Sequence, residues 1–177
     1  MIEGPSGVGK DTIIKELMKR FPMKFKKIPS YTTRPPRVGE VDGFTYNFID
    51  EKTFFEKLES GDIFEHTIRH GAYRGISKTL VDEIVKGGFV ALKDADEIGL
   101  HALQKAFPGR VLSIFITADK NVIRKHLVQR GCDEIEERLA DYENCLKEAG
   151  QYDYTLENNG TLDAIVSKVL GILEKNI

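Results

Sequence analysis

Apolar residues along the chain follow two periods, and these periods predict helices and strands in alternation. Spacings of one, three and four residues place Ile13, Ile14 and Leu17 on one face of a helix near the N-terminus. Short apolar runs at 89–92 and 111–116 are typical of strands buried in a parallel sheet. Strands that alternate with helices predict an α/β fold, in which helices cover both faces of a parallel sheet.

The middle of the first half departs from this alternation and predicts a small, strand-rich insert at about 28–77. Pro35 and Pro36 exclude a helix or a central strand around them. Polar and apolar residues alternate at 44–48 and at 63–68, which predicts half-buried strands. Besides the first helix, we predict helices at 52–60, 77–86, 97–106, 119–130, 132–150 and 162–173, and strands at 1–3, 25–30, 44–48, 63–68, 89–92, 111–116 and 152–156.

A glycine-rich stretch near the N-terminus carries the first candidate chemistry. It runs Gly4-Pro5-Ser6-Gly7-Val8-Gly9-Lys10-Asp11-Thr12 and fits the phosphate-binding pattern G-x-x-x-x-G-K. Glycines let the backbone approach a ligand closely and turn its N–H groups toward an anion. The start of the following helix and the Lys10 ammonium add positive charge for the β- and γ-phosphates of a nucleotide. The alternative is a glycine turn that binds nothing.

Position 11 departs from the pattern, which has Ser or Thr there to bind magnesium. Asp11 can ligate magnesium directly or through water, but its charge lies close to the phosphates. Thr12 offers a hydroxyl that is shifted by one residue. The sequence leaves both interpretations open.

Composition and charge exclude several classes of protein. The 177 residues are 41% hydrophobic and 31% charged, which is ordinary for one compact globular domain. A net charge of -2 gives no electrostatic reason to expect nucleic acid or an acidic membrane as a partner. No apolar run reaches the roughly 18 residues of a membrane span, and no signal-peptide pattern precedes the loop. Two cysteines, Cys132 and Cys145, are too few for a disulfide framework, so we expect reduced thiols in a cytoplasm.

A second stretch places two arginines on a proline-stiffened loop between Ser30 and Tyr46. It runs Ser30-Tyr31-Thr32-Thr33-Arg34-Pro35-Pro36-Arg37-Val38-Gly39-Glu40-Val41-Asp42-Gly43-Phe44-Thr45-Tyr46. Guanidinium groups such as those of Arg34 and Arg37 suit bidentate contacts with phosphate oxygens, and the alternative is a solvated basic loop. Together with the glycine loop, this stretch resembles the guanylate kinase family. The family pattern S-x-T-T-R-x-x-R-x-x-E-x-x-G-x-x-Y is matched at every fixed position.

The resemblance extends over nearly the whole chain and implies a P-loop kinase that phosphorylates GMP with ATP. It implies a core of 1–27, 78–118 and 140–177, a GMP-binding insert at 28–77 and a short helical lid at 119–139. It also implies that four residues hold the phosphate of GMP, and that Glu40 orients an arginine. These four are Ser30, Arg34, Arg37 and Tyr46.

Two carboxylates match the family positions that recognise guanine. Guanine presents two adjacent donors, N1–H and the 2-amino group, which one carboxylate can accept together, whereas adenine lacks that pair. The resemblance assigns this role to Glu65, although a lone glutamate on a strand is more often merely solvated. Asp94 begins a stretch similar to the family's D-x-D-x-x-G segment, which implies contact with guanine or with the magnesium shell. Asp96 is a candidate helix N-cap, and Lys93 is unusual because the family has an apolar residue there.

The predicted lid carries the remaining catalytic candidates. Arg130 and Arg138 resemble the lid arginines that close over the transferring phosphate, where positive charge stabilises the transition state. His126 stands where the family has a further arginine, and whether Arg124 compensates is open. Asn158 resembles the asparagine of the loop on the adenine side.

The predicted acceptor site departs from the family at two positions of Gly71-Ala72-Tyr73-Arg74-Gly75-Ile76. Arg74 replaces a tyrosine and can still bind phosphate beside Gly75, whereas Ile76 replaces a Ser or Thr and cannot hydrogen-bond guanine. Guanine selectivity is therefore expected to be looser. His66 and His70 are interpreted as surface histidines rather than a metal site.

We predict an ATP-dependent kinase for GMP, with Mg²⁺ as cofactor and with hinges near 28–30 and 76–78. Its catalytic residues are Lys10, Arg34, Arg130 and Arg138, and Asp11 is a candidate metal ligand. Its partners are the small nucleotides GMP and ATP, without nucleic acid or membrane, and the protein is a monomer or a homodimer. The alternatives are a kinase of the same fold that acts on dGMP or ribose 1,5-bisphosphate, and a non-catalytic binding module with the same fold.

Overall fold

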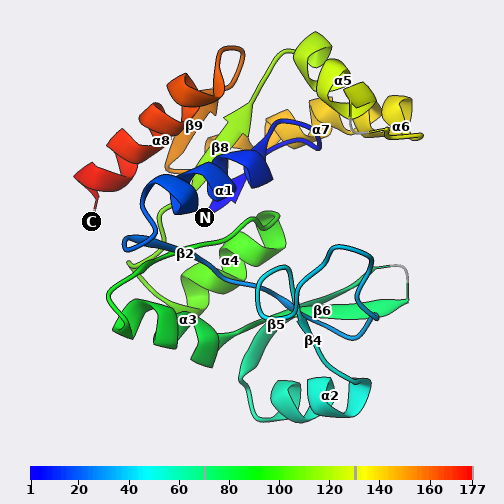
Figure 1. Cartoon of the computed structure of the whole chain (residues 1–177), viewed down its shortest axis with the longest axis vertical. Coiled ribbons are helices and arrows are strands. Elements are labelled where there is room, and N and C mark those ends of the chain that lie inside the picture. The colour runs from blue at the N-terminus through cyan, green and yellow to red at the C-terminus, as the bar shows by residue number, and fades with distance from the viewer. Residues whose placement is uncertain (70, 130, 177) are drawn as a thin grey trace.

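A parallel sheet with helices on both faces carries a smaller sheet at one side, so the molecule has two lobes (Figure 1). The computed structural model describes residues 1–69, 71–129 and 131–176. We call the parallel sheet and its helices the core lobe. The small lobe consists of the mixed sheet β3–β6 and of helix α2, and it lies at the bottom of Figure 1.

The core lobe is built on five parallel strands. The β2 strand pairs with β7, and β8 pairs with both β1 and β9. The Ile2 amide donates to the Lys93 carbonyl at 2.8 Å, which joins β1 to the end of β7. The order is therefore β2-β7-β1-β8-β9, and the prediction of a parallel α/β sheet is confirmed. The strands are β1 (Ile2–Glu3), β2 (Phe25–Lys27), β7 (Val90–Leu92), β8 (Ile114–Thr117) and β9 (Tyr154–Glu157).

Alternation along β8 shows that both faces of this sheet are buried. Ile114 and Ile116 pack into a cluster with α1, α5 and α8, whereas Phe115 between them packs against Leu100 of α4 on the other face. The helices of the core lobe are α1 (Lys10–Arg20), α3 (Lys78–Lys86), α4 (Glu97–Ala106), α5 (Lys120–Gln129) and α8 (Leu162–Lys175). None of the helices in the described part of the chain has the length and apolar character needed to cross a membrane.

The small lobe is a four-stranded sheet in the order β4-β3-β6-β5. Helix α2 (Glu51–Glu59) begins where the Asp50 carboxylate accepts the Thr53 amide at 2.7 Å, and it buries Phe54 completely. The strands are β3 (Tyr31–Thr32), β4 (Asn47–Phe48), β5 (Ile63–Arg69) and β6 (Ala72–Ser77). The prediction of a strand-rich segment here is confirmed.

Two predicted strands lose half or more of their expected length. The segment 25–30 is not one strand, because Pro29 interrupts it and lacks an N–H donor, so β2 ends at Lys27 and the chain passes into the small lobe. The strand expected at 44–48 shrinks to β4, because the Thr45 amide closes a turn onto the Val41 carbonyl at 2.8 Å.

The single helix predicted at 132–150 is wrong. The segment forms α6 (Ile135–Ala140), α7 (Tyr142–Lys147) and a 3₁₀ turn (Ala149–Gln151). Leu139 packs into the cluster with α1, α5 and α8, whereas Leu146 packs with Phe115 on the opposite face of the sheet. One straight helix presents one apolar face, so the chain bends at Asp141 to reach both clusters.

The remaining predicted elements agree with the structure within a few residues, and two predicted caps are present. Ser77 accepts the Leu80 amide at 3.1 Å at the start of α3, and Asp96 accepts the Gly99 amide at 3.1 Å at the start of α4. His70, from the predicted hairpin, and Arg130, from the predicted lid, lie outside the described residues.

Candidate functional site

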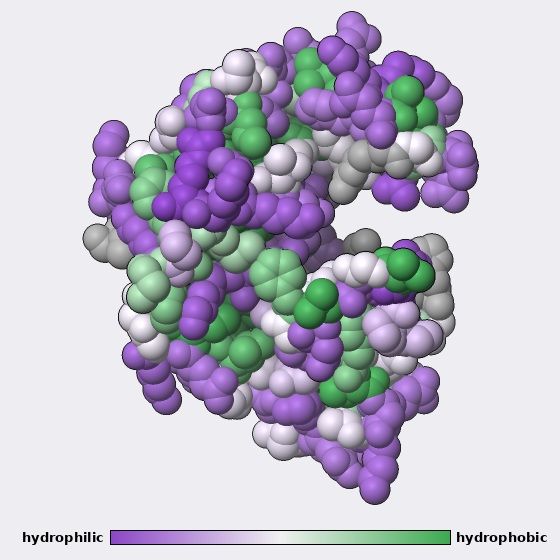
Figure 2. All heavy atoms as spheres, viewed as in Figure 1, coloured by the Kyte–Doolittle hydropathy of each residue, from purple (hydrophilic) through white to green (hydrophobic). Residues whose placement is uncertain are grey.

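A cleft of about 1220 Å³ opens between the core lobe and the small lobe, and Figure 2 shows it as a deep notch in the molecule. Most of the residues that the sequence singled out line it, although they come from elements far apart in the chain. They are Ser6, Gly7, Gly9, Lys10, Asp11, Thr12, Ser30, Arg34, Arg37, Tyr46, Glu65, Arg74, Gly75, Asp94, Arg138 and Asn158. Pro5 and Val8 belong to the glycine loop but do not line the cleft.

The backbone of the glycine loop fits closely against the core. Gly4 has φ +145°, and a Cβ atom built there would meet the Ile116 carbonyl oxygen at 1.9 Å, so no other residue fits without movement. Val8 is fully buried and anchors the loop in the apolar cluster beneath it. Gly9 is the N-cap of α1 with φ +101°, in the left-handed region that favours glycine. The loop therefore directs the start of α1 into the cleft.

Lys10 reaches back over this loop. Its ammonium donates to the Pro5 carbonyl at 3.1 Å and also to the Gly4 carbonyl. Burial lowers the pKa of Lys10, and the nearby Glu3 carboxylate opposes that shift. The Lys10 ammonium is thus held at the loop by two carbonyl oxygens. Charged phosphate oxygens would bind the ammonium more strongly than these carbonyl oxygens do.

Three side chains from distant elements hold the glycine loop from outside. Asn158 donates to the Val8 carbonyl at 2.8 Å, and Arg138 donates to the Ser6 hydroxyl at 2.9 Å. The Nδ1 atom of His126 lies 2.9 Å from the Gly7 carbonyl oxygen. Arg124, the other basic residue considered for this role, pairs with Glu136 of α6 and does not line the cleft.

Glu3 is a buried carboxylate behind the loop that sequence analysis missed. Only 8% of the residue is exposed, and Tyr152 donates its hydroxyl to Oε2 at 3.0 Å. Burial raises the pKa of Glu3 to about 7, against the opposing effects of the Tyr152 hydrogen bond and the Lys10 charge. The sequence could have indicated Glu3, because it is a charged residue at the carboxyl end of a buried strand, where ligands of parallel sheets bind.

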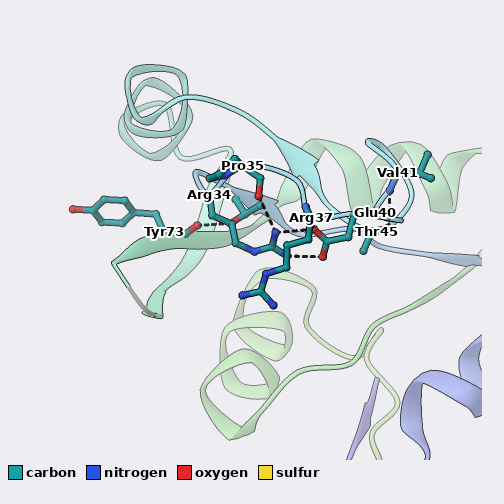
Figure 3. A network of polar contacts seen from close by, with 8 residues as sticks. Arg34, Pro35, Arg37, Glu40, Val41, Thr45 and Tyr73 are labelled. Atoms are coloured by element: carbon teal, nitrogen blue, oxygen red, sulfur yellow. Dashed lines mark hydrogen bonds and ion pairs between the residues drawn. The ribbon is translucent and has the colours of Figure 1, made fainter. Parts of the chain in front are cut away.

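One carboxylate organises the arginine loop of the small lobe (Figure 3). Arg34 donates to both oxygens of Glu40, at 2.6 and 2.7 Å, and the Arg37 amide donates to Glu40 at 2.8 Å. The Arg34 side chain first and the Arg37 amide second hold the pKa of Glu40 down at about 2. The expected contact between Glu40 and an arginine is present, and in Figure 3 the Arg37 side chain extends away from this pair.

The Tyr46 ring lies close to two guanidinium groups. The guanidinium carbons of Arg34 and Arg74 lie 5.1 and 5.4 Å from the centre of its ring, which is cation–π distance. The Nε atoms of Arg34 and Arg74 are buried, and neither has a hydrogen-bond partner among the described residues. Buried donors of this kind are suited to an anion in the cleft.

Two lysines that were not predicted as site residues also lie in the cleft. The Lys27 ammonium is 3.4 Å from an oxygen of Asp11 and 3.4 Å from an oxygen of Asp94. Burial alone would lower the pKa of Lys27, but the Asp94 and Asp11 carboxylates outweigh it and raise the pKa. Lys93 is buried and donates to the Ser30 hydroxyl oxygen at 2.7 Å, and burial lowers the pKa of Lys93.

The strands β5 and β6 set the wall that faces the predicted base site. Glu65 is paired with Ile76 across these strands. A Cβ atom on Gly75 would meet the Ile63 side chain at 2.5 Å and the Glu65 carbonyl at 2.9 Å, so the wall is closely packed at that glycine. Ile76 is 2% exposed and packs with Ile28, which explains why an apolar residue is stable at this position.

The donors for a metal ion are few. No group of three or more His, Cys, Asp or Glu residues is placed to hold a metal ion in the described ranges 1–69, 71–129 and 131–176. Asp11 and Asp94 share one ammonium and line the cleft together with Lys10. Mg²⁺ keeps several waters and uses one or two carboxylates plus substrate phosphates, so this pair fits an ion that arrives with a nucleotide.

Comparisons with known proteins identify the family. Residues 1–176 match the family model described as guanylate kinase. The guanylate kinase of Helicobacter pylori strain 26695 is 36% identical over 162 residues, which cover 89% of this chain and 78% of that protein. The guanylate kinase of Prochlorococcus marinus subsp. pastoris is 34% identical over 179 residues, which cover 98% and 95%.

A solved structure has the same fold. The guanylate kinase from Anaplasma phagocytophilum superposes with a TM-score of 0.71 at 23% identity, covering 98% of this chain and 82% of that one. The match of the family model to nearly every residue, together with two relatives above 30% identity, shows the relationship. The chain belongs to the guanylate kinase family.

Proposed function

We propose that this protein transfers the γ-phosphate of ATP to GMP and releases ADP and GDP. The observation that carries the proposal is the cleft itself, which brings the glycine loop with Lys10 and the arginine loop with Arg34 and Arg37 onto its two sides. A donor nucleotide and an acceptor monophosphate bound there would meet with their phosphates between the two loops.

On the donor side, the residues from Pro5 to Thr12 would bind the ATP phosphates. Their N–H groups and the start of α1 supply positive potential without a flexible side chain. Lys10 would leave the Gly4 and Pro5 carbonyls for the β- and γ-phosphates. Asn158 would support the loop beside the adenine. Arg138, already placed on Ser6, and Arg130 would neutralise the transferring group.

On the acceptor side, the GMP phosphate would be held by Arg34, Arg37 and Tyr46 together with the Ser30 hydroxyl. The Lys93 ammonium donates to the Ser30 oxygen, so the Ser30 proton is available to a phosphate oxygen. Arg74 and the backbone at Gly75 would complete this wall of the site. Glu65 would accept the two adjacent donors of guanine, and Asp94, which follows β7 and lines the cleft, would contact guanine or the magnesium shell.

Mg²⁺ is part of the proposal, with Asp11 and Asp94 as the residues that would hold it. When bound, it would neutralise charge on the transferring phosphate. The protein itself would position the two substrates in line, since phosphoryl transfer depends mainly on positioning and electrostatics. The acceptor phosphate is already ionised, so neither a covalent intermediate nor a general base is required.

Closure of the two lobes would exclude water, which competes as a phosphate acceptor. We propose hinges near 28–30 and 76–78, where the chain passes between the parallel sheet and the small lobe. The core, the GMP-binding insert and the lid at 119–139 would then move as separate parts. We further propose that the protein works in the cytoplasm as a monomer or a homodimer.

A panel of acceptors in a coupled ADP-release assay tests the proposal. GMP, dGMP, AMP and ribose 1,5-bisphosphate are compared at equal concentration, and turnover is expected to be highest with GMP. The sugar bisphosphate is the second candidate acceptor. Arg74 adds a positive charge that suits a second phosphate, and Ile76 cannot make the hydrogen bond to guanine that a Ser or Thr would make. Turnover with the sugar but not with GMP would reverse the choice, and calorimetry without any ATP binding would favour a non-catalytic module.

Replacement of the guanine-reading carboxylate tests the orientation of the acceptor. Glu65→Ala should weaken GMP binding about 10–100-fold, because a bidentate contact of this kind is worth about 1–3 kcal/mol. ATP binding should change little, since the glycine loop is on the other side of the cleft. Calorimetry with each nucleotide measures both, and equal losses for GMP and ATP would contradict this role of Glu65.

A further inference from the structure

Lys27 has a place in the cleft that the proposed function does not use. Its ammonium lies 3.4 Å from one oxygen of Asp11, in the first turn of α1, and 3.4 Å from one oxygen of Asp94, after β7. These are the two carboxylates that fit a metal ion at this edge of the sheet. A side chain of the protein therefore already occupies the space that both carboxylates face.

The fold directs Lys27 to this position. Neighbouring residues of a strand point to opposite faces, and Lys26 lies over the Phe89 ring at 3.8 Å, away from the cleft. Lys27 is the last residue of β2 and is paired with Leu92, so its side chain lies beside the residues that follow β7. Only 22% of the Lys27 side chain is exposed.

The charges at this point are balanced. Asp11, Asp94 and Glu65 together carry three negative charges, and Lys27, Lys10 and the buried Lys93 carry three positive charges when all six are ionised. A divalent cation that approaches the two aspartates therefore meets no net negative charge. One ammonium beside the two carboxylates repels a divalent cation, and the repulsion is stronger in a partly buried cleft than in water.

We propose that Lys27 is a tethered cation that closes the metal site formed by Asp11 and Asp94 until nucleotide phosphates bring the ion in. In the free protein the ammonium holds the two carboxylates. Bound nucleotide adds several negative charges next to them and so restores attraction for a divalent ion. The second step, entry of the ion with a nucleotide, rests on the proposed kinase function. The first step, in which Lys27 blocks the metal site of the free protein, does not.

Titration with Mn²⁺ in the absence of nucleotide tests whether Lys27 blocks the metal site. The signal of free Mn²⁺ in electron paramagnetic resonance reports how much of the ion the protein removes from solution. Lys27→Met should bind one Mn²⁺ at least about tenfold more tightly than the wild-type protein, because a repelling charge is lost. Lys26→Met is the matched control and should match the wild type. Lys27→Met combined with Asp94→Asn should lose the gained site.

The outcomes separate the inference from the proposed function. No gain in Lys27→Met, or the same gain in Lys26→Met, overturns the inference, and Lys27→Gln repeats the test should the methionine variant not fold. Adding ADP to the wild-type protein should increase Mn²⁺ binding beyond what ADP binds alone. Tighter Mn²⁺ binding by Lys27→Met without any effect of ADP would support the blocking of the metal site by Lys27. The same result would overturn the entry of the ion with a nucleotide, and it would count against the donor site of the proposed kinase.

Discussion

The two loops that face each other across the cleft are built in opposite ways. The glycine loop is shaped by its backbone, since Gly4 leaves no room for a Cβ atom beside Ile116 and Val8 is fully buried. The arginine loop is shaped by side chains, and Glu40 holds Arg34 and the Arg37 amide while the chain around them is exposed. The donor side thus depends on core packing and the acceptor side on one carboxylate.

This difference matters for how each side tolerates change. A backbone cradle binds phosphate whatever the neighbouring side chains are, provided that the core beneath it stays intact. A side-chain cradle can be altered residue by residue, as Arg74 and Ile76 illustrate on the acceptor side. Changes on the donor side should therefore alter stability together with binding, whereas changes on the acceptor side should alter binding alone.

The largest effect is expected when the close backbone approach of the glycine loop is blocked. Gly4→Ala should lower the free energy of unfolding by about 3–5 kcal/mol, because φ +145° and the contact with Ile116 both oppose a Cβ atom. Chemical denaturation measures the loss. Gly39→Ala is the matched control in the arginine loop, where φ is +83° but the space is open, and should cost only about 1 kcal/mol. Equal costs would show that the two loops do not differ in packing.

A smaller effect is expected from pH, because carboxylates on the two sides shift in opposite directions. The pKa of Glu3 is raised to about 7, so between pH 4.5 and 7 the folded protein binds this proton more tightly than the unfolded chain does. The Glu3 contribution to stability should therefore fall as pH rises through this window, by up to about 3 kcal/mol. Urea denaturation at several pH values should show this fall in the wild type but not in Glu3→Gln.

Two comparisons make that pH test specific. Glu59→Gln, at an exposed carboxylate of α2, should leave the slope of the wild type unchanged. Glu40, whose pKa is lowered to about 2, is ionised in the folded protein across the window, so it adds only a small rise in stability near pH 4.5–5.5, where the unfolded chain still binds some of this proton. An unchanged slope in Glu3→Gln would show that another group titrates with folding.

The next effect concerns the acceptor side alone. Glu40→Gln should raise the KM for GMP about 10–100-fold, because Arg34 and the backbone at Arg37 lose the charge that orients them. The midpoint of thermal unfolding and the KM for ATP should hardly move, since the loop around Glu40 is largely exposed. Glu56→Gln, which removes the surface pair with Lys52, is the control and should change neither. A loss of stability comparable to that of Gly4→Ala would contradict the comparison.

Sequence alone predicted the architecture because its signals are local. The period of apolar residues gave the parallel sheet, and the caps Ser77 and Asp96 accept backbone amides as expected. The helix expected at 132–150 failed because its bend depends on two clusters on opposite faces of the sheet. No local pattern carries that information.

The site was predictable where a motif fixes it and not where contacts between distant segments do. The glycine loop and the arginine loop are contiguous stretches, and both line the cleft as expected. Lys27 and Glu3 were missed because each gains its meaning from partners brought together by the sheet, Asp94 for Lys27 and Tyr152 for Glu3. A search for charged residues at the carboxyl ends of the predicted strands would have found Glu3. It would have missed Lys27, because the strand was predicted to run on to residue 30, whereas β2 ends at Lys27.

The smallest expected effect tests whether Lys93 acts through Ser30. Lys93 donates to the Ser30 oxygen at 2.7 Å, and this leaves the Ser30 proton for the acceptor phosphate. Lys93→Met and Ser30→Ala should each raise the KM for GMP, and the double variant should show a coupling of about 0.5–1.5 kcal/mol. The KM for ATP should stay constant in all three variants. Additive effects on the KM for GMP would mean that Lys93 supports the site through packing or long-range charge instead of through the Ser30 hydroxyl.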